Sequence, residues 1–132
     1  MKKVNYKAVL TIVLSLVLFS GLSAQNKKVY IERHVKNLIT AIKSDNDGLK
    51  RSGIYWAGFY KVNETAPVLL ELFPYESSKN KILIALSLYQ MGEESCIMKL
   101  LELSKNESNG EVKRICNAVV EEFQNNTIFT SR

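Results

Sequence analysis

Three segments of this sequence begin with the same pattern at a nearly constant spacing. The starts are Leu49-Lys50-Arg51, Asn80-Lys81-Ile82 and Val112-Lys113-Arg114, so the offsets are 80 − 49 = 31 and 112 − 80 = 32. A fixed period of this length is typical of stacked helical arrays, in which each unit buries its apolar face against its neighbours. The spacing therefore predicts an all-α architecture and disfavours catalysis as the default function.

Apolar periodicity predicts six helices, with turn residues between them. The expected ranges are 29–43, 49–62, 66–73, 80–91, 94–104 and 111–124. Asp45 and Asp47 are candidate N-caps of the second helix, and Ser77 or Ser78 begins the fourth. Proline is tolerated in a first turn, where the sequence places Pro67. Gly92 is expected to end the fourth helix in a left-handed conformation.

The odd-numbered helices superimpose when they are shifted by one period (66 − 35 = 31), which aligns four apolar columns and one polar column. The apolar columns are Val35/Ala66/Ile97, Leu38/Leu69/Leu100, Ile39/Leu70/Leu101 and Ala41/Leu72/Leu103. The polar column is Thr40, Glu71 and Glu102. Because both helix families share one period and the loops are short, the sequence predicts a short α-solenoid of about three antiparallel helix pairs.

The first 24 residues have the pattern of a secretory signal peptide. Lys2, Lys3 and Lys7 precede an uncharged run over residues 8–19, and Ala24 is the small residue at the expected cut. An uncleaved anchor is the alternative, although a spanning helix needs about 20 apolar residues. We therefore expect residues 1–24 to direct export to the periplasm or the medium, 25–124 to form the repeat domain, and 125–132 to be a flexible tail.

Removing the leader changes the charge of the chain. Three of the 18 basic residues and none of the 13 acidic ones leave with it, so the rest carries 15 − 13 = +2. Nucleic-acid-binding domains usually carry a clustered basic face. The sequence therefore predicts no nucleic-acid partner.

Two strings in the even-numbered helices resemble the short bacterial HEAT-like repeats. They are Lys81-Ile82-Leu83-Ile84-Ala85-Leu86-Ser87-Leu88-Tyr89-Gln90-Met91-Gly92 and Val112-Lys113-Arg114-Ile115-Cys116-Asn117-Ala118. In that family a helix begins Val-Arg, continues with small residues and ends near Ile-Gly. Trp56 and Ser87 depart from the pattern, since they stand where the family prefers alanine. The resemblance implies an α-solenoid that acts mostly as a binding scaffold.

Chemistry-bearing residues are sparse. His34 is the only histidine, and the sequence has neither metal-ligand spacing nor a phosphate-binding glycine loop. We therefore expect no enzyme activity, no metal and no cofactor. Cys96 and Cys116 fall on neighbouring predicted helices. An exported protein can pair them in a disulfide, but two small packed side chains are the favoured interpretation.

Aromatic residues gather on the second predicted helix and after the third. They are Tyr55, Trp56, Phe59, Tyr60 and Tyr75. The first three span an arc too wide for one buried stripe, which makes this cluster a candidate partner-binding surface. The alternative, which we favour from sequence, is that the first helix covers these rings.

The sequence thus predicts an exported, non-enzymatic helical-repeat scaffold that binds a protein or a second copy of itself. Its binding face would be lined by the odd-numbered helices, with Thr40, Glu71 and Glu102 exposed. Two alternatives remain: a membrane-tethered regulator that retains its leader, and a ligand-binding or lyase-type HEAT-like protein. Only the tether would bring the chain to a membrane.

Overall fold

The computed structural model describes the backbone of residues 31–130 and the side chains of residues 31–127. The chain divides into two compact units, Met1–His34 and Val35–Arg132. The described residues of the first unit, 31–34, are helical. Over its described residues, the second unit consists of helices and turns without a strand, so the prediction of an all-α chain is confirmed there.

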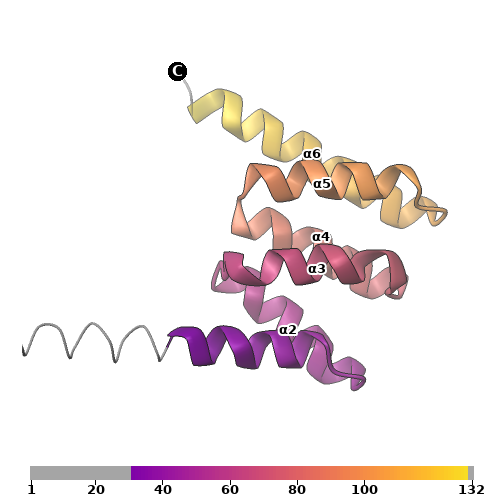
Figure 1. Cartoon of the computed structure of the whole chain (residues 1–132). Helices are drawn as coiled ribbons and strands as arrows, with labels where there is room; N and C mark the ends of the chain where they lie inside the picture. The colour runs from indigo at the N-terminus through magenta and orange to yellow at the C-terminus, as the bar shows by residue number, and fades with distance from the viewer. Residues whose placement is uncertain (1–30, 131–132) are drawn as a thin grey trace, which may run out of the picture. The chain divides into compact units, whose positions relative to one another are not determined.

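The helices of the second unit lie in two layers (Figure 1). Helix α4 contacts both α2 and α6 in one layer, and α3 contacts α5 in the other. The layers are joined where α3 and α5 pack against α4 and where α5 packs against α6. The bounds are Asp47–Phe59 for α2, Ala66–Leu72 for α3, Ser78–Met91 for α4, Glu94–Lys105 for α5 and Gly110–Thr130 for α6. Residues 35–42 are also helical.

Short 3-10 turns flank α3. Turn η1 (Asn63–Thr65) precedes it and η2 (Phe73–Tyr75) follows it. Pro67 lies in the first turn of α3, as predicted. Pro74 lies in η2, which explains why α3 ends one residue earlier than the sequence suggested.

The N-cap of α2 differs from the prediction. Asn46, and neither Asp45 nor Asp47, is the capping residue, and its side-chain oxygen accepts a hydrogen bond from the Leu49 amide at 3.0 Å. All three side chains are capable caps, so local sequence did not decide between them. The two other expectations were met: Ser77 caps α4, and Gly92 ends that helix at φ 74°.

Helix α6 is longer than predicted. The helix continues to Thr130, whereas the sequence predicted that it would end at Gln124. The predicted end of the sixth helix at Gln124 is therefore wrong, whereas the flexibility expected of residues 125–132 stays a prediction. Polar Asn125-Asn126-Thr127 suggested an end, but the segment contains neither glycine nor proline to break the helix.

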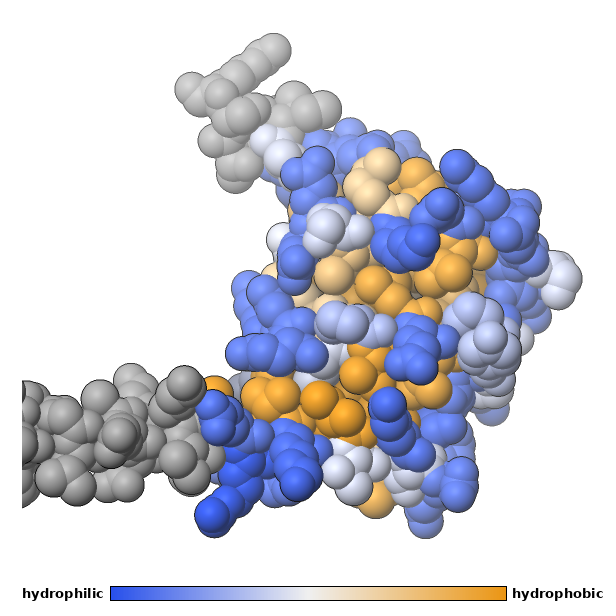
Figure 2. Space-filling view, in the orientation of Figure 1, coloured by the Kyte–Doolittle hydropathy of each residue, from blue (hydrophilic) through white to orange (hydrophobic). Residues whose placement is uncertain are grey.

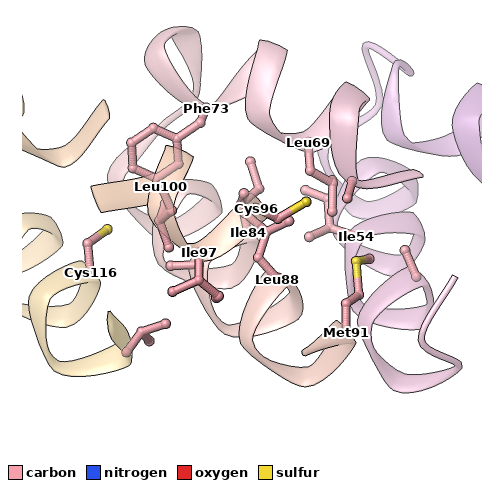
Figure 3. Packing of buried hydrophobic residues seen from close by; sticks show 14 of the residues in the cluster. Ile54, Leu69, Phe73, Ile84, Leu88, Met91, Cys96, Ile97, Leu100 and Cys116 are labelled. Carbon is pink, nitrogen blue, oxygen red and sulfur yellow. The ribbon is translucent and has the colours of Figure 1, made fainter. Parts of the chain in front are cut away.

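The apolar core lies between the two layers (Figure 3). Leu69, Phe73, Ile97 and Leu100 contribute from the α3–α5 layer and are almost fully buried. From the other layer come Ile54, Ala57, Ile84, Ala85, Leu88, Val112, Cys116 and Val120. Leu69, Ile97 and Leu100 belong to the apolar columns that the one-period shift aligned.

Two ion pairs join successive parts of the chain in the same way. Lys50 Nζ donates to Glu76 Oε1 at 2.6 Å, and Lys81 Nζ donates to Glu107 Oε2 at 2.6 Å. In each pair the partners are 26 residues apart. The second pair follows the first by one period, since 81 − 50 = 31 and 107 − 76 = 31. A lysine near the start of one helix is thereby tied to the turn that precedes the next helix of its layer.

Candidate interaction surface

The aromatic side chains of α2 form an exposed cluster. Tyr55, Trp56, Phe59 and Tyr60 leave between 42% and 65% of their surface open. Trp56 stacks with Tyr60 at a centroid distance of 5.4 Å, and Tyr55 stacks with Phe59 at 5.9 Å. Trp56 and Phe59 also meet edge to face at 5.5 Å. The rings therefore pack on one another while remaining accessible.

Two glycines explain why these rings point outward. A Cβ on Gly53 would lie 3.0 Å from the Ala41 Cβ and the Ile42 amide nitrogen, so residues 35–42 approach α2 at that point. A Cβ on Gly58 would lie 2.7 Å from the Ser87 Cα, so α4 approaches on another side. Both neighbours therefore pack on the small side chains of α2. The favoured prediction, that the first helix covers the aromatic rings, is wrong.

Tyr75 is even more exposed, at 85%. It lies on η2, next to the Glu76 that pairs with Lys50 in the first turns of α2. Within the described residues, the ring contacts that join the aromatics of α2 do not extend to Tyr75. The sequence placed all five aromatics in one candidate site, and the structure separates this one from the other four.

The polar column of the odd-numbered helices is exposed as a set. Thr40, Glu71 and Glu102 are all accessible. The Thr40 hydroxyl donates to the Lys36 carbonyl at 2.9 Å, and Lys99 Nζ donates to Glu102 Oε2 at 2.7 Å. The hydrogen bond from Lys99 lowers the pKa of the Glu102 carboxyl.

Apolar surface lies between the charged side chains in the view of Figure 2. Met98 is exposed on α5, and a shallow depression of about 400 Å³ runs beside it, lined also by Leu101 and Glu102. The α3–α5 layer is therefore a second candidate surface, mixed in polarity, whereas the α2 surface is mainly aromatic.

A groove at the C-terminal ends of α2 and α4, beside α6, was not foreseen from the sequence. Its volume is about 750 Å³, and Phe59, Tyr89 and Phe123 are its aromatic walls. Asn126 Nδ2 donates to the Tyr89 hydroxyl at 3.2 Å across it. The repeat period gave a partial signal, because Lys61 and Gly92, which both line the groove, are one period of 31 residues apart.

Cys96 and Cys116 are both free and buried. Their side chains lie apart on α5 and α6 in Figure 3. Burial raises the pKa of the Cys116 thiol to about 11, and burial likewise raises the pKa of Cys96. The thiolate is the reactive form of cysteine, so the raised pKa values favour the protonated thiol of both residues at neutral pH.

No set of three or more His, Cys, Asp or Glu side chains is grouped for metal binding in residues 31–127. The helices described here include none with the length and apolar character needed to span a bilayer. The leader expected over residues 1–24 lies outside the described residues. Searches with protein-family models, among curated proteins and among solved structures find no match to this chain.

Proposed function

We propose that this chain is an exported, non-enzymatic helical-repeat scaffold that binds a protein partner through the aromatic surface of α2. The observation that carries the proposal is the exposure of Tyr55, Trp56, Phe59 and Tyr60 in one contiguous cluster. Tryptophan and tyrosine are among the residues most enriched at the energetic centres of protein interfaces. A folded chain that leaves four rings of this kind in water has an apolar surface suited to a partner.

The architecture in this proposal is a short α-solenoid of antiparallel helix pairs, of the HEAT-like kind. Three observations support it. The helices alternate between two layers along the chain. The pairs Lys50–Glu76 and Lys81–Glu107 are related by one repeat period. The columns of α3 and α5 also agree in burial: Leu69 and Leu100 are buried, whereas Glu71 and Glu102 are exposed.

Export rests on the leader pattern of residues 1–24. The face of the odd-numbered helices, with Thr40, Glu71 and Glu102, is the second candidate surface for the partner. It includes Glu71 and Glu102 and offers fewer exposed large apolar side chains than the α2 surface. We therefore assign the stronger contact to α2.

A capture experiment tests the proposal. Residues 25–132 are immobilised and exposed to a cell-envelope extract, and the bound protein is compared for wild type, Trp56→Ala, Phe59→Ala and Met98→Ala. Met98 is a matched control because it is exposed to a similar degree but lies on α5. Circular dichroism verifies that each variant is folded.

The proposal predicts a partner that is lost with Trp56→Ala and Phe59→Ala and kept with Met98→Ala. Loss with Met98→Ala alone would move the binding surface to the α3–α5 layer. Capture that is indifferent to all three substitutions would reject both surfaces.

A further inference from the structure

In the part of the chain that the structure describes, two residues have a positive φ, and they are one repeat period apart. Lys61 follows the end of α2 at φ 53°, and Gly92 follows the end of α4 at φ 74°. Their separation is 92 − 61 = 31 residues. The repeat therefore requires a left-handed residue here. Helix α4 is followed by glycine, which adopts this conformation without a steric cost, whereas α2 is followed by lysine.

The contacts of Lys61 within the chain do not explain why this lysine is tolerated. Within the described residues, its ammonium group has neither an ion pair nor a hydrogen bond. The negative end of α2 attracts the cation, but a lysine at the preceding Tyr60, where φ is −89°, would have that attraction without the strain. Strained backbone of this kind is concentrated at functional sites, and Lys61 lines the groove of about 750 Å³ at the ends of α2 and α4.

Glu94 brings the opposite charge to the same groove. It lies in the first turn of α5, where the helix dipole favours a carboxylate. Its side chain has no ion pair or hydrogen bond among the residues described, so Glu94 and Lys61 do not neutralise each other by direct contact. The groove therefore presents one separate cation and one separate anion.

The walls of the groove are aromatic and held by the packing of the helices. Phe59, Tyr89 and Phe123 contribute their rings from α2, α4 and α6. The Tyr89 hydroxyl accepts a hydrogen bond from Asn126 Nδ2 at 3.2 Å. Gly58, which also lines the groove, lets α2 approach the backbone of α4 closely. Preformed clefts of about 300–1,000 Å³, with apolar walls and a few polar groups that set orientation, are typical of ligand sites.

The two charges restrict the class of ligand that fits. A ligand with a carboxylate alone would bring a like charge to Glu94, and a ligand with an ammonium group alone would do the same at Lys61. A zwitterion with an apolar body satisfies both charges and covers the rings. The volume is in the range that holds a drug-sized ligand, which corresponds to a peptide of a few residues rather than to one amino acid.

We propose that this groove binds a short peptide with free termini. The peptide carboxylate pairs with Lys61, its ammonium group pairs with Glu94, and an apolar side chain packs on the three rings. The proposal goes beyond the protein partner of α2, because of the residues that carry it only Phe59 also belongs to the exposed aromatic cluster.

Calorimetric titration of residues 25–132 with the tripeptides Ala-Leu-Ala and Ala-Phe-Ala tests the proposal. Each peptide is used with free termini, with an acetylated N-terminus and with an amidated C-terminus. The informative variants are Lys61→Gly, which suits the left-handed backbone, and Glu94→Gln. Glu93→Gln is the matched control, because Glu93 is the adjacent exposed carboxylate but does not line the groove.

The proposal predicts that a free tripeptide binds with a Kd of roughly 1 mM or lower, and that blocking either terminus weakens binding about tenfold. Lys61→Gly should bind the free and amidated peptides equally, and Glu94→Gln the free and acetylated peptides equally. Glu93→Gln should keep the discrimination of the wild type. Lys61→Gly without peptide should also melt about 3 °C higher, because the strain is relieved.

Amide NMR spectra locate the peptide. The signals of Gly58 and Gly92, which line the groove, should move during the titration, whereas that of Gly110 should not. Failure of both tripeptides to bind at millimolar concentration, equal binding of free and blocked peptides, or a Lys61→Gly variant that still distinguishes the amidated peptide would overturn the proposal. Capture of a protein partner should be unchanged in Lys61→Gly, so the proposed function is tested separately.

Discussion

Helices α2 and α4 occupy the same layer and share a register, yet they bury different parts of their surfaces. α4 has α2 on one side and α6 on the other, and it buries Ile84, Ser87 and Leu88. α2 has α4 on one side and residues 41–42 at Gly53, and it leaves Leu49, Trp56 and Tyr60, here called the end face, partly in solvent. The comparison teaches that exposure in this protein depends on which neighbours a helix has. The composition of the helix alone would assign the aromatic rings to the core.

The largest effect should come from removing a fully buried side chain of the apolar core. Leu88 on α4 is fully buried, whereas Leu49 on α2 is half exposed. Leu88→Ala is expected to lower the free energy of unfolding by about 3 kcal/mol, because it opens a cavity in the core. Leu49→Ala should cost less than about 0.5 kcal/mol, as is usual for substitutions at the surface. Urea denaturation of both variants measures the difference, and equal losses would mean that the end face is not open.

The close approach of α2 and α4 gives the second prediction. A methyl group on Gly58 would meet the Ser87 backbone, whereas no atom lies within 4 Å of a Cβ on Gly110. Gly58→Ala should therefore destabilise the chain by about 2 kcal/mol through overpacking. Gly110→Ala is the control, and thermal melting followed by circular dichroism tests both. A neutral Gly58→Ala would contradict the helix spacing on which the outward turn of the aromatics depends.

The ion pairs give a smaller, pH-dependent effect. The Glu107 side chain, which pairs with Lys81, is nearly buried, whereas Glu102 and its partner Lys99 are both largely exposed. Lys81→Met should cost about 1.5 kcal/mol at neutral pH, because it leaves a poorly solvated carboxylate without its main partner. Lys99→Met, by contrast, should leave the stability unchanged within experimental error, since water screens the pair that it removes.

The hydrogen bond from Lys81 lowers the pKa of Glu107 below its ordinary 4.5. A lowered pKa in the folded state means that this carboxylate stabilises the fold fully above pH 4.5, and that the stabilisation is lost as the pH falls through the lowered pKa. The stability difference between wild type and Lys81→Met should shrink in the same window. A difference that stays constant into acid would show that the pair does not act through the charge of Glu107.

The smallest effect is expected at the end face itself. Tyr60 is mostly exposed, whereas Met91, at the corresponding position of α4, is buried. Tyr60→Ala should change the stability of the dilute monomer by less than about 0.5 kcal/mol. Met91→Ala should cost about 2 kcal/mol. Chemical denaturation at low protein concentration separates this effect from any self-association, and a large loss for Tyr60→Ala would indicate that the ring supports the fold of the single chain.

Much of the fold could be predicted from the sequence, because its strongest signals are local backbone preferences and a regular repeat period. Gly92 ends α4 and Pro67 begins α3 through fixed backbone preferences. The apolar columns of α3 and α5 agree with the buried residues because a shift by one period preserves helix faces. The N-cap of α2 was missed because Asp45, Asn46 and Asp47 are nearly equivalent caps.

The candidate surface could be predicted only in part. The wide arc of Tyr55, Trp56 and Phe59 suggested that some rings are exposed, but which rings are covered depends on tertiary neighbours. Gly53 carries part of that information: it lies three residues before Trp56 and seven before Tyr60, and its missing side chain lets Ala41 and Ile42 approach there while both rings stay exposed. A glycine within a helix has several possible causes, so its role is evident only once both helices are placed.

The exposure of Trp56 is the most direct test of an open end face. Acrylamide quenching of its fluorescence in dilute residues 25–132 measures that exposure, because no other tryptophan contributes. An open end face predicts red-shifted emission and efficient quenching in the native monomer, close to the values of the unfolded chain. Blue-shifted emission with weak quenching at the same dilution would contradict it, because Trp56 would then be covered within a single chain.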